Sequence, residues 1–230
     1  MLEGWAIAGP CVAAVLITAR RLGRQGVKQL LKTALRWRFA PIWYAVAGGS
    51  VLVVYLTAIG IAVLAGNPLE EPLFAWPRQG LLLLVVQQLW VAIGEEYGWR
   101  GFALPRLQER WGSLGGSLIL GVIWAVWHLP LFLMPGSGQD GVNVGVYTLT
   151  IMGHTLLLTL LYNRTNGSVL SAMLFHIALN MLFFTMNFPH GAEAVMPWLW
   201  LVVMLIVIPA LPHPLIRRTA EPVMVRQLEA

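Results

Sequence analysis

The chain is a succession of apolar runs separated by short polar segments, many of which begin or end at Gly or Pro. Most of these runs hold about 20 residues, the length at which an α-helix crosses the hydrocarbon core of a bilayer. The runs cover residues 4–19, 41–65, 80–105, 115–134, 143–162, 168–188 and 197–215. The pattern predicts an all-α, polytopic transmembrane helical bundle with about seven spans in a single membrane-embedded domain, residues 1–230.

The segment that follows the first run differs from the others because it is strongly basic. Between residues 20 and 38, seven Lys or Arg side chains are interleaved with Leu, Val and Trp at helical spacing. Basic amphipathic helices of this kind lie at the membrane surface and are attracted to anionic lipids. We therefore expect an N-terminal amphipathic interfacial helix over about residues 20–40, with the lipid bilayer rather than nucleic acid as its partner.

The composition agrees with a membrane protein. Of the 230 residues, 58% are hydrophobic and only 11% are charged, and the mean hydropathy is +0.71. Soluble globular domains carry about 25% charged residues, so that class is excluded. The single cysteine, Cys11, cannot form an intrachain disulfide, and we interpret it as a small apolar residue.

The net charge of +5 is explained by the expected topology. If all seven runs span the membrane, every Lys and Arg except Arg78 falls on one side of it. Cytoplasmic loops carry an excess of these residues, so this side is predicted to be the cytoplasm. The N-terminus then lies outside, a C-terminal tail over about residues 216–230 is cytoplasmic, and the protein is expected in a cytoplasmic (inner) membrane.

Two adjacent carboxylates, Glu95 and Glu96, interrupt the third run. A carboxylate near the centre of a bilayer costs on the order of 3 kcal/mol, so such residues usually face the interior of a bundle and serve a function. Glu96 lies four residues before Arg100, the spacing of a helical ion pair, so its charge is predicted to be neutralised. Glu95 points about 100° away with no local cation, which leaves it for use as a general base. Alternatively, all three side chains form one buried ion network that only fixes packing.

Histidine and asparagine interrupt three later runs. His128 lies in the fourth run, whereas His176 and Asn180 are four residues apart and share one face of the sixth. Glu95, His128 and His176 all lie well inside their runs, so we expect them to converge at a similar depth. His154, in the fifth run, is expected to be a structural residue that makes an interhelical hydrogen bond.

A carboxylate, two imidazoles and an amide are the groups required to hydrolyse a bond with activated water. Glu95 could take the proton from water, one imidazole could position that water, and Asn180 with the other imidazole could donate hydrogen bonds to the developing oxyanion. Glu95, His128 and His176 could instead bind zinc, since two histidines and one carboxylate are a known catalytic ligand set. The residues alone leave both mechanisms open.

Three ordered motifs in this region resemble those of a known family. Their residues, in chain order, are Glu95, Glu96, Arg100, Trp124, His128, His176 and Asn180. The first three resemble the EExxxR motif of the CAAX protease and bacteriocin-processing family, also called Abi or Rce1-like intramembrane proteases. The next two match an aromatic-xxx-His motif, with Trp where the family usually has Phe, and the last two match HxxxN. The resemblance covers about residues 80–185.

The resemblance implies an all-helical intramembrane endopeptidase with a site open to the cytoplasm and a catalytic core over about residues 80–188. At the matching positions, Glu95 and His128 would activate the water, while His176 and Asn180 would form the oxyanion hole or help to hold a metal. The supporting motif residues would be Glu96, Arg100 and Trp124. Both a metalloprotease mechanism and a metal-free glutamate mechanism are argued for the family.

One alternative from another class of protein stays open. Buried carboxylates and histidines can also form a proton relay or a binding site in a transport or bacteriocin-immunity protein that cleaves nothing. The sequence has no inverted repeat and no matched pair of broken helices, which are typical of such transporters. We therefore predict an endopeptidase that acts on a peptide or membrane-protein substrate.

Overall fold

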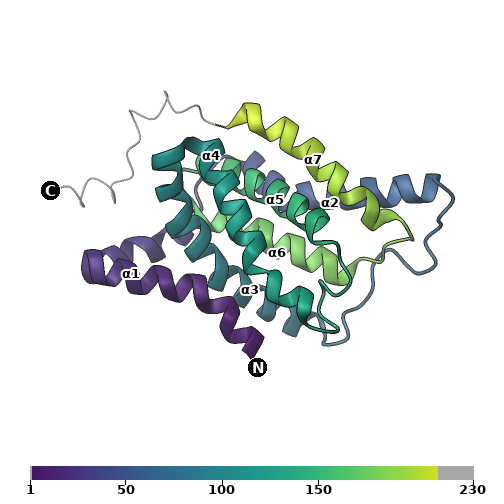
Figure 1. Cartoon of the computed structure of the whole chain (residues 1–230), viewed down its shortest axis with the longest axis horizontal. Helices are drawn as coiled ribbons and strands as arrows, with labels where there is room; N and C mark the ends of the chain where they lie inside the picture. The colour runs from purple at the N-terminus through teal and green to yellow at the C-terminus, as the bar shows by residue number, and fades with distance from the viewer. Residues whose placement is uncertain (1, 212–230) are drawn as a thin grey trace.

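Helices make up most of the computed structural model, which describes residues 2–211, with side chains from residue 7 onward (Figure 1). Within these residues there is no β-sheet, only an isolated bridge between Phe74 and Met186. The α-helices are α1 (Leu2–Lys32), α2 (Pro41–Leu64), α3 (Leu81–Gly98), α4 (Leu104–Trp127), α5 (Val144–Arg164), α6 (Val169–Thr185) and α7 (Ala192–Ala210). The predicted all-α fold is confirmed, whereas the predicted C-terminal tail, about residues 216–230, lies outside the described residues.

Four helical segments of the described chain are long and apolar enough to cross a membrane. They are Pro41–Leu64, Leu81–Leu133, Val144–Arg164 and Ala192–Ala210. Helix α6 is apolar but shorter. Large apolar side chains on the outer faces are strongly exposed, among them Leu64 (89%), Leu82 (79%) and Ile206 (68%). An exposed apolar surface of this extent suits contact with lipid, and the chain is a multi-pass membrane protein.

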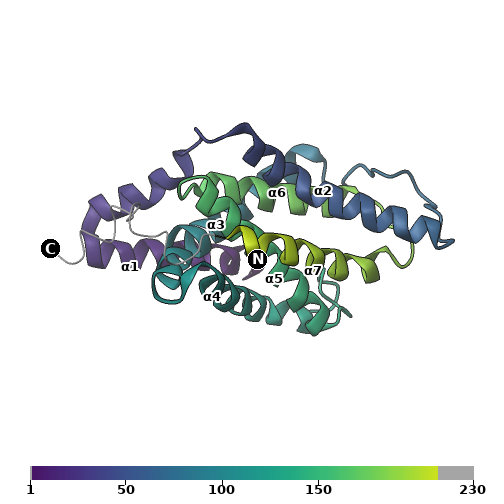
Figure 2. The ribbon, with the colours of Figure 1, turned by 90° about the horizontal axis from the view of Figure 1, so that it is seen from above.

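Two glycines let the chain fold back within segments that are otherwise helical. Gly112 in α4 has φ 73° and ψ 175°, a conformation that glycine adopts easily. Residues eight apart in a straight helix are separated by about 12 Å, yet a Cβ atom on Gly116 would lie 2.8 Å from the backbone nitrogen of Gln108. The two arms of α4 therefore pack against each other, and residues 106–114, which we predicted as a connection, are helical on both sides of the turn. Gly23, with φ 62°, makes a similar turn in α1 (Figure 2).

The basic segment differs from its prediction in both of its boundaries. It shares one helix with the first apolar run, and this helix turns at Gly23 rather than near residue 20. Helical structure then ends at Leu35, after the 3-10 helix η1 (Thr33–Leu35), instead of near residue 40. Pro41 is the first residue of α2 and holds Ala40 in an extended conformation (φ −58°, ψ 136°). Because proline disfavours a helical conformation in the residue before it, the basic helix cannot continue into α2.

Helix α3 lies between α1 and α6 in the bundle (Figure 1). Helix α4 packs on α5, α5 packs on α7, and α2 packs on both α6 and α7. The core that they share contains the large buried side chains of Trp124, Phe175 and Trp200. One polar contact also joins two helices inside it, because the Ser117 hydroxyl in α4 donates a hydrogen bond to the Thr159 hydroxyl in α5 (2.7 Å).

Small residues on α3 allow the backbone of α1 to come unusually close. A Cβ atom on Gly94 would lie 2.7 Å from the carbonyl oxygen of Ile7, and one on Gly98 would lie 2.6 Å from that of Pro10. Both distances are too short for a real side chain. The spacing Gly94-xxx-Gly98 is the small-xxx-small pattern by which membrane helices approach each other closely. It fixes α1 against the turn of α3 that lies between the two glycines.

Contacts between the connecting segments define two ends of the bundle. Arg36 Nη1 donates to the carbonyl oxygen of Asn166 (2.7 Å), and Arg164 Nη2 donates to that of Ala210 (2.9 Å). The segment after α1, the α5–α6 turn and the end of α7 therefore share one end, which we call the Arg36 end. At the other end, the amide of Ala75 in the α2–α3 connection donates to the last residue of α6 (2.7 Å). This grouping is the one that alternating membrane crossings require.

Substitution Gly98→Ala tests the contact between α1 and α3. The new methyl group would lie 2.6 Å from the Pro10 carbonyl oxygen, so α1 must move away; overpacking of this kind costs about 1–3 kcal/mol. Gly60→Ala is the matched control, because a Cβ atom there meets nothing within 4 Å and alanine is preferred over glycine in a helix. We expect a lower midpoint of thermal unfolding in detergent for Gly98→Ala and an unchanged or higher one for Gly60→Ala. Equal midpoints would contradict the close packing.

Candidate active site

The end of α3 places two carboxylates inside the bundle, and the helix widens directly after them. Glu95 is 5% exposed and Glu96 is 0% exposed. The π-helix η2 (Trp99–Ala103) follows and leads into α4. Pro105 gives a physical reason for this wide turn, because its ring would clash with the carbonyl group of residue 101 in a regular α-helix. Such π turns relieve a local misfit within a helix and are frequent at functional sites.

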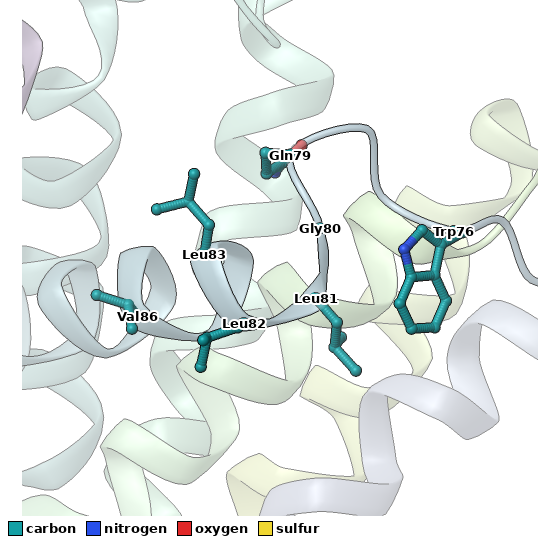
Figure 3. Close-up of a pocket in the computed structure, with 7 residues that line it drawn as sticks. All are labelled: Trp76, Gln79, Gly80, Leu81, Leu82, Leu83 and Val86. Carbon is teal, nitrogen blue, oxygen red and sulfur yellow. The ribbon is translucent and has the colours of Figure 1, made fainter.

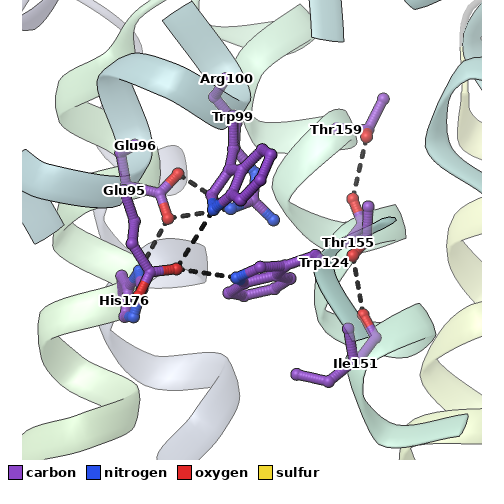
Figure 4. Close-up of polar contacts among 9 residues, drawn as sticks. All are labelled: Glu95, Glu96, Trp99, Arg100, Trp124, Ile151, Thr155, Thr159 and His176. Atoms are coloured by element: carbon purple, nitrogen blue, oxygen red, sulfur yellow. Dashed lines mark hydrogen bonds and ion pairs between the residues drawn. The ribbon is translucent and has the colours of Figure 1, made fainter. Parts of the chain in front are cut away.

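Glu96 holds all the ion pairs found among the described residues. Arg100 Nη1 donates to the two oxygens of Glu96 at 2.9 and 3.1 Å, as the four-residue spacing predicted. His176 on α6 lies with Nδ1 2.7 Å from Glu96 Oε1 and donates to it, since a carboxylate oxygen accepts (Figure 4). Two helices thus supply hydrogen-bonded partners for a carboxylate that has no contact with solvent, which is what a buried charge requires.

Glu95 makes no ion pair with any described residue but is held by two indole groups. Its Oε2 atom accepts a hydrogen bond from Trp124 Nε1 at 2.7 Å and another from Trp99 Nε1 at 3.2 Å (Figure 4). Its Oε1 atom has no hydrogen-bond partner among the described residues. The two oxygens of the Glu95 carboxylate therefore differ. Oε2 is anchored by the indoles, whereas Oε1 has its lone pairs available for a water molecule.

Trp124 on α4 is the side chain around which the other candidate residues gather. It is 2% exposed, and the guanidinium of Arg100 lies over its ring, 4.3 Å from the centroid. The ring of His128 lies 5.7 Å and that of His176 lies 5.8 Å from it, measured between centroids. The structure thus brings Glu95, His128 and His176, which come from three different helical segments, to one indole.

The hydrogen bonds of the two histidines define which ring nitrogen is left for chemistry. His128 Nδ1 lies 2.7 Å from the backbone carbonyl oxygen of Trp124 and donates to it. His176 Nδ1 donates to Glu96 in the same way. In a neutral imidazole the nitrogen opposite a donating Nδ1 carries a lone pair. Both Nε2 atoms are therefore hydrogen-bond acceptors when the rings are neutral, and donors when the rings are protonated.

Asn180 lies on the same helix as His176 but is held by a residue of α3. Its Nδ2 atom donates to Oε1 of Gln88 at 2.7 Å. Gln88 is 2% exposed, so the acceptor of this hydrogen bond is buried. The Nδ2 group has two hydrogens, and the bond to Gln88 uses one of them.

Two residues at this site, Trp99 and Gln88, were missed by the sequence analysis. Gln88 is a polar residue within the third run, and it lies seven residues before Glu95 and therefore on the same face of the helix, but no site role was predicted for it. Trp99 lies four residues after Glu95, which is also a same-face spacing. Counting polar atoms along one helical face, rather than charged residues, would have identified both.

The predicted hydrogen bond of His154 is wrong. Its side chain is 5% exposed, and neither ring nitrogen has a hydrogen-bond partner within the part of the chain that the structure describes. The ring instead lies against aromatic groups, perpendicular to Trp200 at 4.3 Å and close to Phe175 at 5.8 Å between centroids. Edge-to-face contact of this kind stabilises aromatic pairs without a hydrogen-bond acceptor.

The zinc alternative finds no support in this arrangement. Among residues 7–211, no group of three or more His, Cys, Asp and Glu side chains lies close enough together to hold a metal ion. The side chains as they lie do not fit the ligand set of two histidines and one carboxylate, so no step below passes through a metal.

A hollow at the start of α3 is separate from this site. It has a volume of about 590 Å³ and is lined by Trp76, Gln79, Gly80, Leu81, Leu82, Leu83 and Val86 (Figure 3). None of these side chains is a candidate catalytic residue. Most of them are apolar and face outward, where lipid would cover them, so the candidate site is defined by its polar groups and not by this hollow.

Comparison with known proteins finds similarity in the segment that contains the candidate active site. Residues 77–182 match the family described as type II CAAX prenyl endopeptidase Rce1-like. The chain is also similar to CAAX prenyl protease 2 of Methanococcus maripaludis, with 30% identity over 99 residues. That alignment covers 40% of this chain and 36% of the relative, so the chain matches about a third of the relative's length. All the candidate residues lie within the segment that matches the family.

Proposed function

Residues 77–182 of this chain belong to the Rce1-like family of type II CAAX prenyl endopeptidases, and we propose that the protein is an intramembrane endopeptidase in which Glu95 activates the hydrolytic water. The observation that carries this proposal is the asymmetric environment of the Glu95 carboxylate. Two indole donors fix Oε2, at 2.7 and 3.2 Å, and leave Oε1 for a water molecule. A general base must be held in a defined position within hydrogen-bond reach of the proton that it removes.

The reaction begins with a proton transfer. Glu95 Oε1 takes a proton from water while the water oxygen attacks the carbonyl carbon of the peptide bond. His128 Nε2 accepts a hydrogen bond from the same water and orients it, since its Nδ1 is already committed to the Trp124 carbonyl group. Because the two indoles hold the carboxylate in place, little reorientation is needed before the attack.

The negative charge that develops on the carbonyl oxygen is stabilised by donors from α6. Asn180 offers the amide hydrogen that it does not use on Gln88, and protonated His176 offers Nε2–H. The carboxylate of Glu96 stabilises the positive charge that His176 carries in this role. The carbon–nitrogen bond then breaks, and the proton held by Glu95 passes to the leaving amine, which restores the carboxylate.

We place the Arg36 end of the bundle in the cytoplasm. It carries the basic segment 20–38, and cytoplasmic connections are the ones enriched in Lys and Arg. We propose seven crossings, made by the first arm of α1, α2, α3, the second arm of α4, α5, α6 and α7, although the first arm of α1 and α6 are not among the four segments long and apolar enough to cross on their own. With this orientation the protein lies in the cytoplasmic (inner) membrane with its C-terminal side inside, and its substrate is a peptide or membrane-protein segment that enters from the cytoplasm.

Substitution Glu95→Gln tests the general base. Glutamine keeps the size of the side chain and an oxygen for the two indoles, but it cannot take a proton from water. Loss of a general base lowers the rate by about 100- to 10,000-fold. We expect kcat for cleavage of a membrane-anchored reporter peptide in proteoliposomes to fall by this factor, with the midpoint of thermal unfolding unchanged.

Glu109→Gln is the control for this experiment, because it removes an exposed carboxylate outside the site and should leave kcat unchanged. If the wild-type protein cleaves no peptide but carries a proton flux that Glu95→Gln abolishes, a proton relay replaces the protease. If Glu95→Gln instead lowers the unfolding midpoint and the yield of folded protein, the carboxylate is a structural group.

Substitution Trp124→Phe tests the anchoring of Glu95. Phenylalanine keeps an aromatic ring against both histidines but removes the hydrogen bond to Oε2, and a hydrogen bond to a charged group contributes about 1.5–3 kcal/mol. We expect kcat to fall by about 10- to 100-fold with little change in KM, and Trp99→Phe to have a smaller effect because its bond is longer (3.2 Å against 2.7 Å). Trp198→Phe, at a position 64% exposed on α7, is the control. Equal activity in Trp124→Phe and Trp198→Phe would refute the anchoring role.

Elemental analysis of the purified protein separates the two mechanisms left open by the sequence. The measurement compares wild type with the double variant His128→Ala plus His176→Ala, alongside wild-type activity in the presence of a chelator. We expect less than stoichiometric zinc in both proteins and cleavage that survives the chelator, because the donor groups do not form a ligand set. Stoichiometric zinc in wild type that is lost in the double variant would make the histidines ligands and overturn the mechanism proposed here.

A further inference from the structure

A second hollow lies at the Arg36 end, between the segment that follows α1 and the turn that joins α5 to α6. Its volume is about 390 Å³, and its lining consists of Leu35, Arg36, Trp37, Arg38, Thr165 and Asn166. The lining thus contains two arginines, a tryptophan and two small polar residues, and no carboxylate. It shares no residue with the candidate active site.

Hydrogen bonds fix the two walls of this hollow relative to each other. Arg36 Nη1 donates to the carbonyl oxygen of Asn166 (2.7 Å), and the Ser168 hydroxyl donates to the carbonyl oxygen of Arg36 (2.7 Å). The Tyr44 hydroxyl donates to the carbonyl oxygen of Trp37. Backbone atoms of both walls are therefore tied to side chains of neighbouring elements, and the hollow is formed in advance of any ligand.

No carboxylate among the described residues pairs with the arginines around the hollow. All ion pairs among the described residues involve Glu96, which belongs to the active site. Arg36 uses Nη1 on neutral carbonyl groups, and the guanidinium of Arg38 lies over the ring of Trp37, 5.0 Å from its centroid. Five further cations, between residues 20 and 32, precede the hollow in the sequence. The site is thus complementary to an anion.

The apolar side chains of the lining decide which kind of anion fits. Leu35 is 71% exposed and Trp37 is 59% exposed, and both lie beside the arginines. A free phosphate ion would leave these surfaces in water. A lipid whose headgroup meets the arginines would cover them with its glycerol and acyl chains, and tryptophan is enriched at this depth of a membrane.

From this combination we infer that the hollow binds the headgroup phosphate of an anionic glycerophospholipid of the leaflet at the Arg36 end. Arg38 and Arg36 contact the phosphate, and the proximal acyl chain lies along Leu35 and Trp37. Lipid binding at this place does not depend on whether the protein cleaves a peptide.

The test uses the full chain in detergent, titrated with phosphatidylglycerol or phosphatidylcholine, with bound lipid counted by native mass spectrometry. Arg38→Gln removes one charge from the hollow. Arg110→Gln is the matched control, because Arg110 is also an exposed arginine stacked over a tryptophan, Trp111, at 4.8 Å, but it lines no part of the hollow. A third arm replaces the lipid with inorganic phosphate and measures protection against thermal unfolding.

Wild type should retain phosphatidylglycerol in preference to phosphatidylcholine, and Arg38→Gln should weaken this retention by about fivefold, as expected for one arginine at a membrane surface. Arg110→Gln should retain the lipid as wild type does. Equal losses in the two variants, or no loss in either, would overturn the site, as would a wild type without preference for phosphatidylglycerol. Protection by inorganic phosphate equal to that by phosphatidylglycerol would also overturn it in favour of a simple phosphate site. Unfolding midpoints measured in phosphatidylcholine verify that both variants are folded.

Discussion

The buried charge of Glu96 is the constraint on which this architecture depends. A carboxylate with no exposure, in a helix that crosses a membrane, is strongly destabilising unless it is paired and hydrogen-bonded. Arg100 supplies the pairing from the same helix at 2.9 Å, and His176 supplies a second donor from α6 at 2.7 Å. The need to pair Glu96 therefore affects more than one local contact. It fixes how α3 and α6 lie against each other, and it directs the ring of His176 into the site.

Satisfying Glu96 in this way separates it from its neighbour. Glu95 points to a different face, where it meets indole groups instead of cations, so one carboxylate stabilises the bundle and the other is available for proton transfer. Trp124 connects the two, because the same ring lies under Arg100 and donates to Glu95. An aromatic residue without a donor could fill this space, but it could not orient the Glu95 carboxylate.

The sequence was sufficient for the features that depend on local spacing. The apolar runs predicted an all-α membrane protein, and the interval from Glu96 to Arg100 predicted their pairing. The turn at Gly112 was not predicted, because a glycine in a helical pattern does not reveal that its φ is positive. The contact of Trp124 with Glu95 was missed because tryptophan counts as apolar in such patterns, and its donor meets an acceptor 29 residues away. The hydrogen bond predicted for His154 was wrong for the opposite reason. Its polar ring is packed against aromatic side chains and meets no hydrogen-bond partner among the described residues.

The close contact of α1 adds a wall that the motif residues alone would not provide. Gly94 and Gly98 lie on one face of α3, immediately before and after the turn that carries the carboxylates, and the backbone of α1 occupies that face. Helix α6 approaches α3 with His176, and α4 approaches it with Trp124, so three segments surround the turn. Such a site limits the number of water molecules around Glu95, which strengthens its interactions with the groups that hold it. The glycines bear no chemistry themselves, but their lack of a side chain is what allows α1 to form this wall.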